Sequence, residues 1–242
     1  MENKLLMKKL IIILLAILLV VGVSLFFLKK DLFYKILGEK HVSEGIIEYE
    51  ITYPKIDANN MVLSGMPTKA ALKFKNNNTI NEMSGMMGLI NIAYISNQTN
   101  HSVFQSLTLF NKKYVSTISP EDMKRLNEGF VSKMEFGNNV MIIAGFKCKE
   151  AIVTLKDNST LHVYYTNDID IANPNWSNPF SEIGGVLMDF EMERYGVVFH
   201  MKAKTVLAQK IEESSFQFSD EYKKISYSEL EKILMELNPD SQ

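Results

Sequence analysis

The chain has 242 residues, of which 46% are hydrophobic and 22% charged, and its formal net charge is −2. Only two arginines occur, Arg125 and Arg194, and neither lies in a basic patch. Because nucleic acid is bound mainly through lysine and arginine on its phosphates, this composition excludes a nucleic-acid partner. A single cysteine, Cys148, excludes an internal disulfide, so stability has to come from an apolar core.

An apolar run from Leu10 to Leu28 stands near the N-terminus, with lysine pairs at both ends. Its 19 residues are close to the length that a helix needs to cross a bilayer core of about 30 Å. A cleaved secretion signal is the alternative, but its apolar part is usually shorter and ends in small residues. Here the run ends in the large side chains Leu25 to Leu28, which favour a retained transmembrane anchor.

The rest of the chain is expected to form one domain. No cysteine directly follows the apolar run, so the anchor is protein and not a thioether-linked lipid. No linker rich in Pro, Gly or Ser divides the remaining sequence. We therefore expect a membrane anchor and linker in residues 1–40 and a single extracytoplasmic domain in residues 41–242, which leaves only the short N-terminal tail inside.

From Gly45 onward the dominant hydrophobic period is two, which is typical of strands with one buried face. Apolar and polar residues alternate over 47–53 and again around Leu72 and Phe74. Residues 89–96 and 103–110 predict two further strands, joined by a polar connection.

Two hairpins are predicted in the second half. One joins 151–155 to 160–165 through an Asp-Asn turn, and the other joins 186–192 to 197–207 through Tyr195 and Gly196. Short connections of this kind make the neighbouring strands antiparallel.

Helix signals are few. Ser226 and Glu229 form a capping-box pattern, and an apolar stripe follows it at helical spacing, from Leu230 to Leu237. Ser119 and Pro120 open a shorter helix. The fold class is therefore mainly β: a curved antiparallel sheet or open half-barrel of eight to eleven strands, with a C-terminal amphipathic helix. A ligand is expected on its concave face.

Catalytic and metal signals are weak. The four histidines are widely separated and none has a second ligand at metal-site spacing, so neither a metal nor another cofactor is implied. His162 and His200 fit structural roles in strands. Cys148 stands between Lys147 and Lys149, which could favour a thiolate. On a strand, however, its side chain points away from both lysines, which favours a buried structural thiol, and we expect no enzyme.

Five side chains are candidates for a ligand groove. Met83, Met86 and Met87 stand among glycines, where flexible apolar side chains can fill a core, line an adaptable apolar groove or bind soft copper. Trp176 and Phe180 belong to a loop rich in Pro and Asn. This aromatic pair can close over a groove or pack beneath a sheet edge.

Three segments of the second half resemble a protein family. They are Ala144-Gly-Phe-Lys-Cys-Lys-Glu-Ala151, Val163-Tyr-Tyr-Thr-Asn-Asp-Ile169 and Gly184-Gly-Val-Leu-Met-Asp-Phe-Glu191. In order and spacing they are similar to motifs of the uncharacterised bacterial envelope proteins of the GLPGLI type. This chain departs from that pattern by having Ile183-Gly-Gly185 in place of Leu-Pro-Gly.

The resemblance implies a compartment and a fold. It implies an envelope protein with an open half-barrel like that of periplasmic lipoprotein carriers, whose concave face receives acyl chains. The apolar run at 10–28 is a second departure, because relatives often carry a cleaved or lipidated signal. That run predicts a single span that tethers the domain to the bacterial inner membrane on the periplasmic side. A non-catalytic binding domain for a lipid or lipoprotein acyl chain is the leading hypothesis. An interaction or sensory module with an envelope protein partner is the alternative.

Overall fold

The computed structural model describes residues 41–237. The predicted transmembrane helix at 10–28, and the whole anchor segment 1–40, lie outside the described residues. Within residues 41–237, none of the helices has the length and apolar character needed to span a bilayer. Residues His41–Gln242 make up one compact unit.

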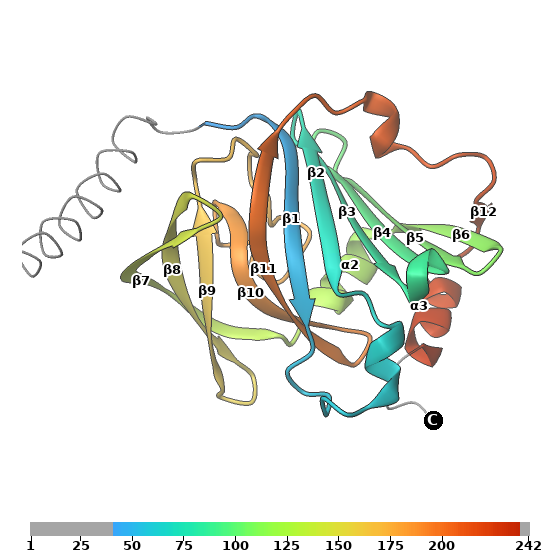
Figure 1. Cartoon of the computed structure of the whole chain (residues 1–242), viewed down its shortest axis with the longest axis horizontal. Helices are drawn as coiled ribbons and strands as arrows, with labels where there is room; N and C mark the ends of the chain where they lie inside the picture. Colours follow the sequence, from blue (N-terminus) through green and yellow to red (C-terminus); the bar gives the residue numbers. More distant parts are fainter. Residues whose placement is uncertain (1–40, 238–242) are drawn as a thin grey trace, which may run out of the picture. The chain divides into compact units, whose positions relative to one another are not determined.

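This unit is built around one open, curved sheet (Figure 1), as the alternation predicts. The neighbouring strands run in the order β12-β6-β5-β4-β3-β2-β1-β11-β10-β9-β8-β7, and every pair is antiparallel except β12 with β6. The strands are β1 (Glu44–Thr52), β2 (Lys69–Lys75), β3 (Asn78–Gly85), β4 (Ile90–Asn97), β5 (Ser102–Leu109), β6 (Lys112–Ile118), β7 (Val131–Ile143), β8 (Phe146–Leu155), β9 (Thr160–Thr166), β10 (Val186–Arg194), β11 (Val197–Ala208) and β12 (Lys223–Lys224).

The number of strands is slightly higher than predicted. Twelve strands exceed the expected eight to eleven. One reason is β12, which consists of two exposed lysines paired with Tyr114 and Val115 of β6. A strand of two residues is too short to show a period-two pattern, so it could not be predicted from the sequence.

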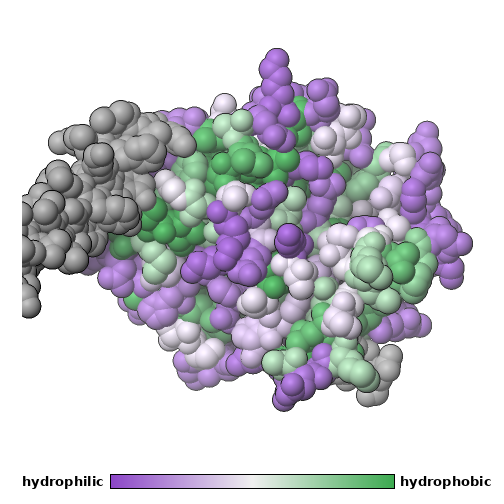
Figure 2. Space-filling model, viewed as in Figure 1, coloured by the Kyte–Doolittle hydropathy of each residue, from purple (hydrophilic) through white to green (hydrophobic). Residues whose placement is uncertain are grey.

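In β1 the alternation of apolar and polar residues correctly predicts which face is buried and which is exposed. Ile47, Tyr49 and Ile51 are buried on the concave side, whereas Glu48 and Glu50 are exposed on the convex side. There Glu50 accepts a 2.8 Å bond from Lys204 Nζ, and Glu48 accepts one of 2.6 Å from the hydroxyl of Thr205. Figure 2 shows the resulting polar surface over the middle of the sheet, so the convex face of the central strands is a solvated face.

Both predicted hairpins are present. Tyr195 and Gly196 connect β10 to β11 with φ angles of 54° and 77°, as a tight turn between twisted antiparallel strands requires. Asn158 has a φ of 65° in the connection between β8 and β9. The strands predicted at 89–96 and 103–110 are β4 and β5, which pair antiparallel.

The helices begin at the predicted caps. The α2 helix (Pro120–Asn127) has Ser119 as its N-cap, and α3 (Tyr227–Glu236) has the complete capping box of Ser226 and Glu229. Leu230 and Leu234 of α3 are buried against Leu107 of β5, so its apolar stripe faces the sheet as expected. Three short 3-10 helices complete the described part: η1 (Met61–Gly65), η2 (Met86–Gly88) and η3 (Glu213–Phe216).

The apolar interior is divided along the sheet. The main core lies under β1, β2 and β8–β11 and includes Phe180 and Ile183 from the connection between β9 and β10. Two smaller clusters lie where α3 packs on β5 and β6. The concave face between these two regions is therefore not filled by a continuous core.

Candidate functional site: a cavity on the concave face

A cavity of about 610 Å³ lies on the concave face of the sheet. On the sheet side its wall consists of inward-pointing residues at alternate positions of neighbouring strands, a direct result of the period-two pattern. Most of them are apolar, and they come from the strands on both sides of β1. The strand residues with the largest apolar side chains are Leu72, Met83, Ile90, Ile92, Phe190, Met192, Phe199 and Met201. Leu234, Glu236 and Leu237 line the cavity from the C-terminal end of α3.

The η1 segment covers one side of this cavity. Met61, Val62 and Met66 line it, and Met61 is at the same time 88% exposed to solvent, so the cavity opens to the surface beside η1. Figure 2 shows hydrophobic atoms at the surface over this segment. A Cβ on Gly85 would come within 2.5 Å of the carbonyl oxygen of Gly65, so the close approach of η1 to β3 requires glycine there.

The connection between β9 and β10 covers another side, with Ile171, Pro174 and Asn178 lining the cavity. Its shape is fixed by Asn175, whose buried side-chain amide donates to the carbonyls of Ile183 and Gly185 at 2.7 and 2.8 Å. The connection is joined to the sheet by Tyr94, whose hydroxyl donates to the carbonyl of Ser177 at 3.3 Å.

The tyrosines of the cavity are neutral hydrogen-bond donors. The hydroxyl of Tyr53 donates to the carbonyl of Pro67 at 2.7 Å, and that of Tyr49 donates to the carbonyl of Leu187 at 2.8 Å. Burial raises the pKa of Tyr53 to about 12 and that of Tyr94 to about 12. Charged phenolates are therefore absent from the cavity at neutral pH.

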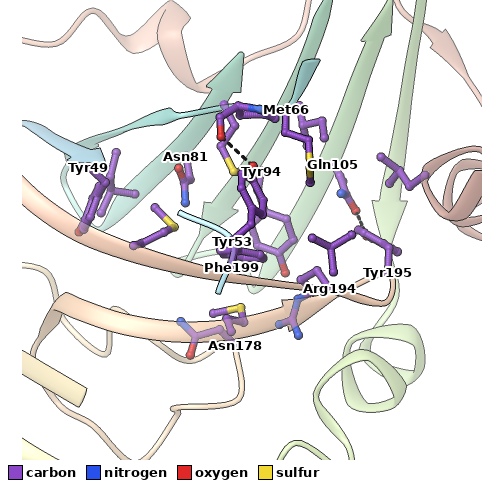
Figure 3. A pocket seen from close by; sticks show the side chains of 18 of the residues that line it. Tyr49, Tyr53, Met66, Asn81, Tyr94, Gln105, Asn178, Arg194, Tyr195 and Phe199 are labelled. Atoms are coloured by element: carbon purple, nitrogen blue, oxygen red, sulfur yellow. Dashed lines mark hydrogen bonds between the residues drawn. The ribbon is translucent and has the colours of Figure 1, made fainter. Parts of the chain in front are cut away.

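One part of the wall is polar. Figure 3 shows Arg194, Tyr195 and Gln105 together at one side of the cavity. The hydroxyl of Tyr195 donates to Gln105 Oε1 at 2.6 Å and lies 2.9 Å from the hydroxyl of Tyr227. Arg194 donates to the carbonyls of Leu126 and Glu193 at 3.2 and 3.1 Å, and burial lowers the pKa of its guanidinium.

The structure brings only some of the five predicted groove residues to this cavity. Met83 and Met86 line it. Met87 is fully exposed and is not among the lining residues. Trp176 is half-buried, packs on the cluster of Val103, Ile118 and Tyr227, and has its ring 5.5 Å from that of His101.

Phe180 is completely buried in the main core, with its ring centroid 6.1 Å from that of Phe190. It thus packs behind a residue that lines the cavity, against the interior strand β10, and takes neither of the two positions expected for this aromatic pair.

Sequence reasoning missed Arg194 and Gln105. Gln105 does carry a signal, since it is a polar residue at an inward position of an otherwise apolar strand face, between Val103 and Leu107. Arg194 carries a similar signal, because it continues the inward series of Phe190 and Met192. A polar residue in phase with a buried face indicates either a satisfied core group or a site.

Other reactive groups lie elsewhere. Cys148 is completely buried, and burial raises the pKa of its thiol to about 12, as expected of a structural thiol. His162 bonds Glu150 at 2.7 Å and His200 bonds Asp189 at 2.6 Å, so both take the structural roles predicted for them. Within residues 41–237, His, Cys, Asp and Glu side chains do not gather in groups of three or more that could hold a metal ion.

Comparison with known proteins gives a distant likeness. No family model matches the chain, so the resemblance to GLPGLI-type proteins stays a prediction, and no curated protein matches. Among solved structures, LprF from Mycobacterium bovis is similar, with 10% sequence identity and a TM-score of 0.29 over 72% of this chain and 89% of LprF. At this TM-score the likeness supports no inference about a ligand.

Proposed function

We propose that residues 41–242 form a non-catalytic binding domain for an apolar ligand, namely a lipid or the acyl part of a lipoprotein. The observation that carries the proposal is the cavity of about 610 Å³ between an apolar sheet wall and the η1 segment. Its volume falls in the range of about 300 to 1,000 Å³ that sites for small ligands occupy.

An acyl chain suits the chemistry of this wall. Each methylene moved from water into an apolar site contributes roughly 0.8 kcal/mol, so a long chain gains enough for specific binding without directional contacts. The methionines of the wall are unbranched and adapt to chains of different shape; they are Met61, Met66, Met83, Met86, Met192 and Met201.

The proposal includes a cellular location for the domain. The predicted helix at 10–28 would hold it at the bacterial inner membrane, on the periplasmic side, where acyl chains are present. Met61, Val62 and Leu237 both line the cavity and are exposed, so an entrance with apolar edges would allow a chain to pass between bilayer and cavity.

Binding can be tested with a variant that fills the cavity. Ile92 of β4 lines the cavity, so Ile92→Trp would occupy space that a ligand needs. Thr117 of β6 is exposed and out of phase with the inward residues, so Thr117→Trp is a control with the same new side chain outside the cavity. Purified residues 41–242 would be examined by native mass spectrometry for co-purified lipid and by displacement of a fluorescent fatty acid.

We expect the unmodified domain and Thr117→Trp to bind the fluorescent fatty acid equally, and Ile92→Trp to bind at least tenfold more weakly. Absence of co-purified lipid together with no displacement in the unmodified domain would contradict the proposal. Equal binding by all three proteins would place the ligand outside this cavity.

A second candidate function rests on the edge strand β7. Phe136, Val140, Met141 and Ile142 are exposed there, and β7 is the last strand of the sheet on this side. An open edge with apolar side chains can receive a strand of another protein. If the domain is an interaction module for an envelope protein, crosslinking in membranes through β7 should recover one stoichiometric partner.

A further inference from the structure

Arg194 places a positive charge in the wall of a cavity that is lined mostly by apolar side chains. It is the last residue of β10, its side chain belongs to the cavity wall, and it is partly buried. Among residues 41–237 no carboxylate forms an ion pair with it, whereas Arg125, the other arginine, is paired with both Glu231 and Asp122. A partly buried cation without a counter-charge is costly, and proteins usually pair it.

The neighbours of Arg194 hold its guanidinium without neutralising it. Nη1 donates to the carbonyls of Leu126 and Glu193, and Nη2 donates to Asn127 Oδ1 at 2.8 Å. All three acceptors are uncharged. They orient the group and leave its full charge available to a ligand.

Two of the donors of Arg194 remain for such a ligand. A guanidinium has five N–H groups, and three of them take part in the bonds just described. The Nε–H and one N–H on Nη2 have no partner within the described part of the chain. These two donors belong to adjacent nitrogens of the planar group, and adjacent nitrogens of a guanidinium can bind both oxygens of a carboxylate or two oxygens of a phosphate.

The groups beside Arg194 favour an anion as well. The hydroxyls of Tyr94, Tyr195 and Tyr227 surround it, and burial raises the pKa of each, so they stay neutral. Glu193, the neighbouring residue in sequence, is exposed on the opposite face of β10. Among the described residues that line the cavity, the one carboxylate is Glu236, which lies at the C-terminal end of α3 and forms no ion pair with Arg194.

We infer that the ligand is an anionic amphiphile, with its acyl chain along the apolar wall and its carboxylate or phosphate oxygens on Arg194. The inference rests on the proposed function, because it assigns an orientation and a charge to the same ligand. It predicts discrimination between chains of equal length that differ only in the charge of the head group.

The test uses the full chain in phosphatidylcholine vesicles and two photoreactive probes, a diazirine-bearing palmitate and the corresponding diazirine-bearing hexadecanol. Labelled residues are mapped by mass spectrometry. Arg194→Gln removes the charge from the cavity, Arg194→Lys retains it, and Arg125→Gln removes the paired surface arginine as a control. Because each probe is compared between variants at the same lipid concentration, differences in membrane partition cancel.

We expect Arg194→Gln to lower the labelling of cavity residues by palmitate about tenfold or more, the effect of losing a charged hydrogen bond. Labelling by hexadecanol should stay unchanged, and Arg194→Lys and Arg125→Gln should keep palmitate labelling within about threefold of the unmodified chain. A structural role of Arg194 would give a different result: both probes label the cavity, Arg194→Gln lowers the two labellings equally, and Arg194→Lys restores neither labelling. That result would overturn the inference and leave the proposed function standing. If neither probe labels the cavity of the unmodified chain, the proposed function itself fails.

Discussion

The hydroxyl of Tyr53 donates a 2.7 Å hydrogen bond to the carbonyl oxygen of Pro67, so the residue that follows β1 holds the residues that precede β2. The chain between them contains η1, which carries Met61 and Val62 over the cavity. One side-chain bond thus closes the base of the segment that separates the proposed ligand site from solvent.

Removing this bond should loosen the η1 segment without disturbing the sheet. In Tyr53→Phe the carbonyl of Pro67 loses its partner, which costs about 0.5–1.5 kcal/mol of unfolding free energy. We expect the amides of Leu63 and Met66, which bond within the segment, to exchange hydrogen faster, while those of β1 stay protected. Hydrogen exchange followed by mass spectrometry measures both.

Tyr165→Phe is the matched control for this change, because the hydroxyl of Tyr165 has no hydrogen-bond partner in the described part of the chain. It should leave exchange in 54–68 unchanged. Equal exchange rates in the two variants would mean that the Tyr53 bond does not hold the segment.

The position of α3 depends on its buried leucines. Leu230 is completely buried against Leu107, whereas Met235 of the same helix is 48% exposed. Leu230→Ala should therefore lower the unfolding free energy by about 2–5 kcal/mol, and Met235→Ala by less than about 0.5 kcal/mol. Urea unfolding of both variants measures the difference, and similar losses would contradict the packing of α3 described here.

The thiol of Cys148 should be unreactive in the folded protein. Burial raises its pKa from an ordinary value near 9 to about 12, so the thiolate fraction at pH 8 is about a thousandfold lower than in the unfolded chain. Iodoacetamide should label the protein rapidly in urea and very slowly without it. Since the chain has one cysteine, no other thiol contributes to the signal.

The same pKa shift predicts how stability depends on pH. Because the pKa of Cys148 is higher in the folded state, its contribution to stability is complete below about pH 9 and is lost as the pH rises toward 12. Cys148→Ala should thus lose less stability between pH 8 and pH 10.5 than the unmodified protein does. Parallel stability curves for the two proteins would contradict the shift.

Much of the fold is predictable because the alternation of apolar and polar residues along a strand indicates which of its faces is buried. The alternation of Ile47, Tyr49 and Ile51 and the capping box of Ser226 and Glu229 depend on neighbours within a few residues, and both predictions are confirmed. The cavity is different. Met83 and Met61 line the same cavity because η1 comes close to the end of β3 at Gly65 and Gly85, and no local sequence pattern predicts that approach.

The sequence also does not distinguish residues of the filled core from residues of the cavity wall. Phe180 and Phe190 are both buried aromatics, yet only Phe190 lines the cavity. A filled core and an apolar ligand site require the same residue types, so hydrophobicity alone cannot separate them. The polar exceptions Gln105 and Arg194 are the better signal, because a polar side chain in phase with an apolar face needs a partner there.

The buried amide of Asn175 should be indispensable to the connection between β9 and β10. Its two N–H groups bond the carbonyls of Ile183 and Gly185, so Asn175→Asp would place a carboxylate against two carbonyl oxygens. We expect a loss of about 3 kcal/mol or more at pH 7, since two bonds vanish and the buried charge keeps only the uncharged amide of Asn178 as a donor. Burial raises the pKa of such a carboxylate, and its protonated form can restore one bond, so the variant should regain stability as the pH falls from 7 toward 5.

Asn173→Asp is the control, because it makes the same change at an exposed position of this loop. It should alter the unfolding free energy in urea little at either pH. Equal losses of stability in the two variants would show that the amide of Asn175 does not organise the cavity wall.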